Sequence, residues 1–161
     1  MKLYRIILVD DEEEVRKSII RKIKWEENGF LVAGDAENGE DALEKIELLE
    51  PDLILTDIRM PYMDGLTLAE RVRQKYPSMK IVIFSGYDDF EYAKQAIKLN
   101  VTEYILKPVN VEELTAILQK IKANLDQEIE QKRNVNLLRE NYIKSLPILR
   151  EQFLNELVNA P

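Results

Sequence analysis

Short apolar runs recur along this chain, and each one leads into polar residues and then into a stretch with helical periodicity. A continuous apolar run bounded by turn residues predicts a strand that is buried on both faces. The predicted strands are residues 2–9, 30–36, 53–56, 80–84 and 101–106. Apolar side chains spaced three and four residues apart predict helices in the intervening segments. The predicted helices are residues 12–24, 40–49, 66–76 and 88–99, with a last helix that begins near Val111.

This alternation of strands and helices predicts an α/β fold. Strands that alternate with helices form a parallel sheet with helices on both of its faces. Right-handed crossovers leave few arrangements of such a sheet. We therefore expect residues 1–123 to form a flavodoxin-like, doubly wound, five-stranded parallel sheet with the strand order 2-1-3-4-5.

The last predicted helix continues past the end of this domain, so residues 124–161 are expected to form an extended C-terminal helical tail. An apolar stripe ends at Leu125, residues 126–136 are mostly polar, and the apolar pattern resumes at Leu137. Pro147 then has to break or kink a helix, or begin a new one. The tail fits two interpretations, a dimerisation helix of a coiled coil or a linker to a further domain. The polar gap disfavours a continuous coiled coil, whose a and d positions stay apolar over several heptads.

Composition excludes several functions. The chain has 161 residues, with 30 Asp and Glu against 23 Lys and Arg, and a net charge of −7. Nucleic-acid phosphates repel such a chain, so we expect no direct nucleic-acid contact from this segment. The absence of Cys excludes thiolate metal sites, and the absence of His excludes a phosphohistidine on this chain. No apolar run approaches the roughly 18 residues of a membrane span, so we expect a cytoplasmic protein without membrane contact.

Reactive side chains follow four of the predicted strands. They are Asp10 with Asp11, then Asp57, Ser85 and Lys107. The carboxyl ends of parallel strands share one edge of a sheet, and in the expected order these strands are neighbours, so the side chains converge there. Each of these residues alone is a common turn or surface residue, and only their combination indicates a functional site.

Three carboxylates at one sheet edge repel one another and have raised pKa values unless a cation lies among them. Mg²⁺ fits best, because it prefers oxygen ligands, keeps bound waters and leaves room for a phosphate. Asp57 is then a candidate nucleophile of the kind that forms an aspartyl-phosphate. Mg²⁺ and the Lys107 ammonium would neutralise charge on the transferred phosphoryl group, and the Ser85 hydroxyl would donate to a phosphate oxygen.

These motifs resemble the receiver domain of bacterial two-component response regulators over roughly residues 2–123. The resemblance is carried by Asp10-Asp11, Asp57 followed by Met60-Pro61-x-x-Asp64-Gly65, Ser85-Gly86 and Lys107-Pro108. It implies that a partner sensor histidine kinase transfers a phosphoryl group to Asp57 with Mg²⁺ as the cofactor. It also implies that Lys107 is the phosphate-binding lysine, and that the proline after it is in the cis form.

The same resemblance implies roles for the remaining site residues. Asp11 is expected to bind Mg²⁺ directly, Asp10 largely through water, and Arg59 through its backbone carbonyl. Ser85 and Tyr104 are expected to form a switch pair, in which the hydroxyl moves to the phosphate and the aromatic ring turns inward. The switch would then alter dimerisation through the surface formed by the fourth helix, fifth strand and fifth helix, or through the long last helix.

The segment SGYDDFEYAKQAIKLNVTEYILKPV resembles, more narrowly, the receivers of regulators that carry an AraC-type helix-turn-helix domain. The tail LLRENYIKSLPILREQFLNELV is similar to the segment that follows those receivers. The resemblance implies transcription regulation by the full-length protein as a homodimer. Contact with DNA would come from a C-terminal output domain that is absent from this chain.

We thus expect a phosphoacceptor switch rather than a turnover enzyme. One alternative is a phosphohydrolase with Asp57 as its nucleophile, which would need an acid–base residue such as a second Asp at position 59, where Arg59 stands. The other alternative is a receiver-like interaction module that is never phosphorylated. The complete set of acids with Lys107 argues against that module.

Overall fold

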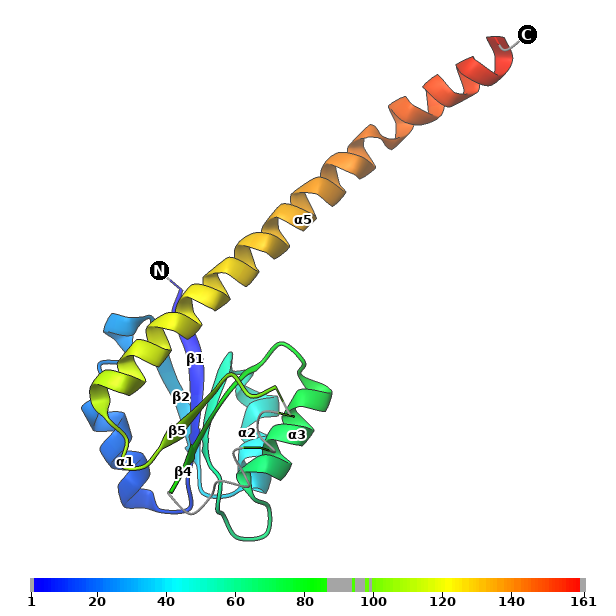
Figure 1. Ribbon diagram of the computed structural model, residues 1–161. Helices are drawn as coiled ribbons and strands as arrows, with labels where there is room; N and C mark the ends of the chain where they lie inside the picture. Colours follow the sequence, from blue (N-terminus) through cyan, green and yellow to red (C-terminus); the bar gives the residue numbers. More distant parts are fainter. Residues whose placement is uncertain (1, 87–93, 95–97, 99, 160–161) are drawn as a thin grey trace. The chain divides into compact units, whose positions relative to one another are not determined.

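A five-stranded parallel sheet forms the centre of the protein, as a computed structural model describes it for residues 2–86, 94, 98 and 100–159, with side chains described up to residue 145. Its strands are β1 (Tyr4–Val9), β2 (Phe30–Ala36), β3 (Leu53–Asp57), β4 (Lys80–Ser85) and β5 (Glu103–Leu106). They lie in the order β2-β1-β3-β4-β5, and each neighbouring pair is parallel (Figure 1). The predicted fold class and strand order are confirmed.

Helices cover both faces of this sheet. They are α1 (Glu13–Lys22), the 3-10 helix η1 (Glu26–Asn28), α2 (Gly39–Leu49), α3 (Gly65–Lys75) and α5 (Val111–Asn159). Helices α2 and α3 lie on one face, and α1 with the first turns of α5 lies on the other (Figure 1). Of the helix predicted over residues 88–99, only residues 94 and 98 belong to the described part of the chain.

Burial of the central strands decides which residues reach the carboxyl edge of the sheet. All five residues of β3 are buried, and this strand pairs with β1 on one side and β4 on the other. The register places Val9 opposite Thr56, Asp57 opposite Phe84, and Ser85 opposite Leu106. Strands β1, β3, β4 and β5 therefore end at similar heights along a common edge.

Strand β5 begins at Glu103 rather than at Val101, where the apolar pattern begins. Thr102 accounts for the difference, because its hydroxyl oxygen accepts the Ile81 backbone N–H at 3.0 Å. Its own backbone N–H donates to the Ile81 carbonyl at 2.7 Å. This exchange ties the chain to the start of β4 before the ladder with β5 begins.

The chain divides into two compact units, Met1–Lys122 and Ala123–Pro161, and α5 supplies residues to both. Helix α5 continues through Pro147, so of the outcomes predicted for this residue, a break and a new helix start do not occur. Several apolar side chains of the second unit are exposed, namely Ile129, Val135, Leu137, Leu138, Tyr142 and Ile143. Among the described residues, no helix is both long enough and apolar enough to cross a membrane.

The loop between β3 and α3 folds back onto the end of β3. The Gly65 N–H donates to the Ile58 carbonyl at 2.7 Å, and the Asp64 carboxylate caps α3 by accepting the Thr67 N–H at 2.7 Å. A Cβ at Gly65 would lie 2.2 Å from the Asp57 carbonyl oxygen and 2.9 Å from the Ile58 Cα. Both atoms belong to the backbone, so the absence of a side chain allows this close approach.

Gly65→Ala is therefore expected to lower the free energy of unfolding by about 3 kcal/mol, because a buried backbone segment has to move to admit the methyl group. Chemical denaturation of the metal-free protein measures this change. Gly34→Ala is the matched control, since its Cβ would meet only a methyl group of Leu49 at 3.0 Å, and that side chain can shift. Equal stability of Gly65→Ala and the wild type would contradict the packing argument.

Candidate functional site

Three carboxylates gather at the carboxyl edge of the sheet. Asp10 and Asp11 follow β1, Asp57 ends β3, and one oxygen of each lies within 4.8 Å of the others. Asp10 and Asp57 are only 0% and 6% exposed, whereas Asp11 is exposed to solvent. The predicted convergence of these acids is therefore present in the fold.

Lys107 joins the acids from the end of β5. Its Nζ lies 3.1 Å from Asp57 Oδ2 and 3.3 Å from Asp10 Oδ2. The Lys107 backbone N–H donates to the Ser85 carbonyl at 2.7 Å, which extends the pairing with β4 by one residue. The Lys107–Pro108 peptide bond is cis, as the resemblance implied.

Burial sets the protonation behaviour of this cluster. Burial raises the pKa of Asp57, and the Lys107 ammonium and the Ile58 N–H oppose this only in part. The pKa of Asp10 is also raised, first by burial and further by the Asp57 charge. Burial alone would lower the pKa of Lys107, but the Asp57 and Asp10 carboxylates outweigh it, and the net shift is upward.

The donor set suits a divalent cation. Three carboxylates face one ammonium, so the ionised cluster carries an excess of two negative charges. All the side-chain donors are oxygens, which are the ligands of hard cations such as Mg²⁺ and Ca²⁺. The acidic pocket of Asp10, Asp11 and Asp57 can thus hold a metal ion.

Ser85 and Tyr104 meet beside this cluster. Ser85 ends β4 and is fully buried, and its hydroxyl forms a hydrogen bond with the Tyr104 hydroxyl. Tyr104 is half-buried on β5, the neighbouring strand. The two residues predicted to form a switch pair are therefore in direct contact. Arg59 has an exposed side chain on the loop after Asp57, and the role of its backbone carbonyl stays a prediction.

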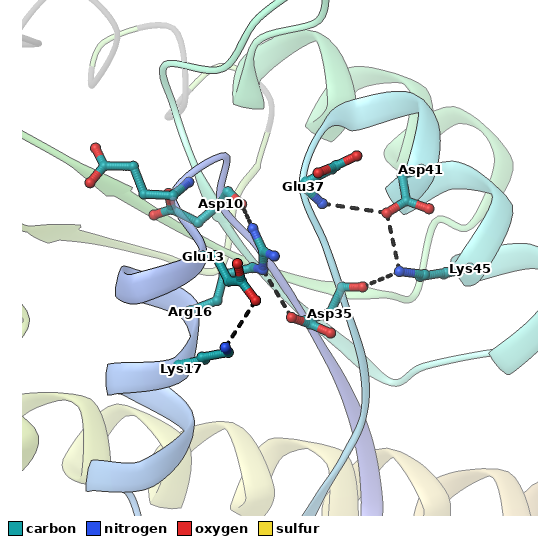
Figure 2. A network of polar contacts seen from close by, with 9 residues as sticks. Asp10, Glu13, Arg16, Lys17, Asp35, Glu37, Asp41 and Lys45 are labelled. Carbon is teal, nitrogen blue, oxygen red and sulfur yellow. Dashed lines mark hydrogen bonds and ion pairs between the residues drawn. The ribbon is translucent and has the colours of Figure 1, made fainter.

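The sequence reasoning missed Arg16, which contacts the acidic turn from α1. Its Nη1 donates to the Asp10 carbonyl at 2.5 Å, and its Nε donates to Asp35 Oδ2 at 2.9 Å (Figure 2). One signal was present, because Arg16 has helical spacing with the apolar residues Ile20 and Ile23 and so lies on the inward side of α1. A charged residue in that stripe indicates a buried polar partner.

A doubly wound sheet with an acid cluster and a lysine at its carboxyl edge defines a class of receiver-like α/β proteins. Residues 6–119 match the sequence model of the response regulator receiver domain. The chain belongs to this family of two-component signalling domains, which confirms the resemblance drawn from its motifs.

The most informative relatives are transcriptional regulators. The chain is 37% identical over 158 residues to the transcriptional regulatory protein YesN of Bacillus subtilis, covering 97% of this chain and 42% of YesN. It is 31% identical over 157 residues to the transcriptional regulatory protein HptR of Staphylococcus aureus, covering 98% of this chain and 61% of HptR. The chain thus spans only part of the length of these relatives.

Solved structures agree with this assignment. The REC domain of AraT, a response regulator from Geobacillus stearothermophilus, has a TM-score of 0.75 and 39% identity, covering 78% of this chain and 98% of that chain. A two-component transcriptional regulator AraC from Clostridium phytofermentans has a TM-score of 0.71 and 35% identity, with the same coverage of 78% and 98%. The narrower resemblance to AraC-type regulators is also supported.

The raised pKa of Asp57 predicts how its charge affects stability. A carboxyl with a higher pKa in the folded than in the unfolded protein destabilises the fold at pH values above both, and this effect disappears as pH falls below the unfolded value. Asp57→Asn should therefore raise the free energy of unfolding of the metal-free protein by about 1 kcal/mol at neutral pH. The gain should shrink in acid.

Urea denaturation between neutral and acidic pH, with a chelator present, measures this gain. Asp52→Asn is the matched control, because Asp52 precedes the opposite end of the same strand and accepts the Arg5 N–H at 2.9 Å, as an asparagine also can. A destabilised Asp57→Asn protein at neutral pH would show that the ion pair with Lys107 outweighs burial.

Proposed function

We propose that this chain accepts a phosphoryl group on Asp57 from a partner sensor histidine kinase, with Mg²⁺ as its cofactor. The observation that carries the proposal is the cluster of Asp10, Asp11 and Asp57 beside Lys107, in which one oxygen of each carboxylate lies within 4.8 Å of the others. An acceptor carboxylate, a cation site and a fixed ammonium are the parts that phosphoryl transfer to an aspartate needs.

The side chains of Asp10, Asp11 and Asp57 would hold the Mg²⁺, together with the backbone carbonyl of Arg59. When bound, the ion supplies positive charge that stabilises the oxygens of the transferring phosphoryl group. The excess negative charge of the cluster supports this assignment. Without a bound cation, the three carboxylates repel one another and would also repel the negatively charged phosphoryl group.

The contacts of Asp57 orient it as the nucleophile. Its Oδ1 accepts the Ile58 backbone N–H at 2.8 Å, while Oδ2 faces Lys107. One carboxylate oxygen attacks phosphorus, the phosphorus–nitrogen bond of the donor phosphohistidine breaks, and Lys107 pairs with the phosphoryl oxygens. Arg59 stands where a phosphohydrolase of this kind would carry its acid–base residue, which favours acceptance over turnover.

The contact between Ser85 and Tyr104 is the proposed switch. The Ser85 hydroxyl would leave the Tyr104 hydroxyl for an oxygen of the phosphorylated Asp57, and the Tyr104 ring would turn inward. Moving such an equilibrium from 1:99 to 99:1 takes about 5.5 kcal/mol of differential stabilisation. Phosphate contacts with Mg²⁺, Lys107 and Ser85 are charge-assisted, and several of them together are of this order.

The kinase has to reach Asp57 from the carboxyl edge of the sheet. A groove of about 590 Å³ lies beside Lys107, between α1 and the segment that follows β5. It is lined by the apolar side chains of Val15, Ile19, Ile23, Pro108, Val109 and Val111. This groove offers a protein donor an apolar surface next to the reacting groups.

The output is altered dimerisation that serves transcription regulation in the full-length protein. We assign residues 1–123 to the phosphoacceptor domain and residues 124–161 to a linker or dimerisation helix. The exposed apolar side chains of α5 support a homodimer, since they gain burial when two such helices pair. DNA binding would belong to a C-terminal domain beyond this chain, as the relatives' greater length supports, and the protein would act in the cytoplasm.

Intact mass spectrometry with acetyl phosphate tests the phosphoacceptor directly. The wild type is expected to gain one phosphate only when Mg²⁺ is present, and Asp57→Asn is expected to gain none. Asp52→Asn should be labelled like the wild type, because it lies at the other end of the sheet. Normal labelling of Asp57→Asn would refute the assignment of the acceptor, and repeated turnover of the donor would favour a phosphohydrolase.

Light scattering coupled to size-exclusion chromatography tests the switch. Phosphorylation is expected to shift the wild type toward the dimer. Ser85→Ala should still accept the phosphate but should dimerise about tenfold more weakly, because a hydrogen bond to a charged group contributes roughly 1.5–3 kcal/mol. Ser78→Ala, at an exposed serine, is the matched control. An unchanged dimer constant for phosphorylated Ser85→Ala would contradict the proposed switch.

A further inference from the structure

The polar groups of Asp10 are held from four directions. Its N–H donates to the Ala36 carbonyl at 3.1 Å, and its Oδ1 accepts the Glu12 N–H at 2.8 Å. Its Oδ2 faces Lys107, and its carbonyl oxygen accepts from the Arg16 guanidinium at 2.5 Å. This carbonyl belongs to the peptide that joins Asp10 to Asp11, so the contact with Arg16 restrains both acids of the turn.

Arg16 is itself held in place by Asp35 of β2, whose backbone in turn contacts α2. Its side chain is 11% exposed and pairs through Nε with Asp35 Oδ2 on β2 at 2.9 Å. Lys45 of α2 donates to the Asp35 backbone carbonyl and pairs with Asp41 at 3.1 Å (Figure 2). The guanidinium thus bridges a carbonyl at the end of β1 and a carboxylate on β2.

This arrangement differs from the contacts of Lys107 in one respect. Lys107 faces carboxylate oxygens, which are the atoms that a cation would need. Arg16 donates to a backbone oxygen of the turn and leaves the carboxylate oxygens of Asp10 and Asp11 available. Arg16 therefore adds order and positive charge near the acids without competing for their ligand atoms.

The contribution of the Arg16–Asp35 ion pair to the free energy of unfolding is not a sufficient reason for this network. One partner of the pair is largely buried and the other is partly exposed, Arg16 at 11% and Asp35 at 43%, and such a pair contributes little net stability because desolvation offsets much of the attraction. Its value lies in geometry, because the planar guanidinium fixes the relative position of two acceptors, which a lysine ammonium on a flexible stem does not. Mg²⁺ demands nearly ideal octahedral geometry, so a fixed turn benefits its binding more than that of a more tolerant cation.

We propose that Arg16 is a positioning residue for the divalent-cation site, and that Asp35 orients it. The inference rests on the proposed function, since it assigns to Arg16 the task of holding the Asp10–Asp11 peptide ready for Mg²⁺. Residues that orient metal ligands without touching the metal typically change metal affinity by about 10- to 100-fold when replaced.

Calorimetric titration of the full 161-residue chain with Mg²⁺, without any phosphodonor, tests the proposal. Arg16→Met keeps an unbranched, flexible stem and removes the guanidinium donors, and it should weaken Mg²⁺ binding about tenfold. Arg16→Lys should lie between Arg16→Met and the wild type, because one ammonium cannot hold both acceptors in the same way. Asp35→Asn, which removes only the charge that orients Arg16, should weaken binding measurably but less than Arg16→Met does.

Lys17→Met is the matched control. Lys17 is the next residue of α1 and also forms an ion pair, with Glu13 at 2.9 Å, but both partners are exposed (Figure 2). Its loss should leave Mg²⁺ affinity within about twofold of the wild type, because exposed pairs contribute little.

Two further readouts separate positioning from general destabilisation. In the metal-free protein, hydrogen exchange of the Glu12 amide, which donates to Asp10 Oδ1, should speed up in Arg16→Met and not in Lys17→Met. In phosphorylation by acetyl phosphate, Arg16→Met should need about tenfold more Mg²⁺ for half-maximal rate and retain the rate at saturating Mg²⁺.

Wild-type Mg²⁺ affinity in both Arg16→Met and Asp35→Asn would overturn the positioning role while leaving the proposed function intact. A wild type that binds no Mg²⁺ would overturn both. If Arg16→Met does not fold, Asp35→Asn decides the question, since the Asp35 side chain is 43% exposed and its neutralisation is expected to be tolerated by the fold. A loss of affinity in Lys17→Met equal to that in Arg16→Met would also overturn the proposal.

Discussion

Two buried carboxylates beside one ammonium are the constraint on which the rest of this domain depends. Asp10 and Asp57 lose solvent at the carboxyl edge of the sheet, and Lys107 is the cation that reaches both. Burial of an unpaired charge is costly, so the ends of β1, β3 and β5 have to stay in register. The short turn after β3, with its close approach at Gly65, and the backbone pairing of Lys107 with Ser85 keep them there.

The fold was predictable because its physical basis is local. A strand buried on both faces needs an unbroken apolar run, and such runs are visible at Ile6–Val9, Leu53–Leu55 and Ile81–Phe84 in the sequence. The alternation of strands with helices predicts a parallel sheet. In such a sheet, the residues that follow each strand lie along the same edge, so their side chains converge there. The meeting of Asp10, Asp57 and Lys107 needs no further information, which is why the residue pattern is enough to predict the candidate site.

Other features depend on partners that a sequence pattern does not name. Arg16 contacts the backbone carbonyl of Asp10 and the carboxylate of Asp35 on β2. Every residue has a backbone carbonyl, so the sequence does not indicate which carbonyl accepts a hydrogen bond from Arg16. The late start of β5 depends on a hydroxyl of Thr102 that binds the neighbouring strand. Helix α5 continues through Pro147 because the low helix propensity of one residue is outweighed by the helix-forming residues before and after it.

The exposure of Asp11 has a consequence for how this site relates to its surroundings. Two acids form the floor and stay inside the fold, while the third faces the solvent, so one side of the cluster remains open to water. A cation held there keeps part of its hydration shell and exchanges with the bulk solution. In the proposed magnesium site, occupancy would therefore follow the free concentration of the ion in the surrounding solution, and the reactivity of Asp57 would vary with that concentration.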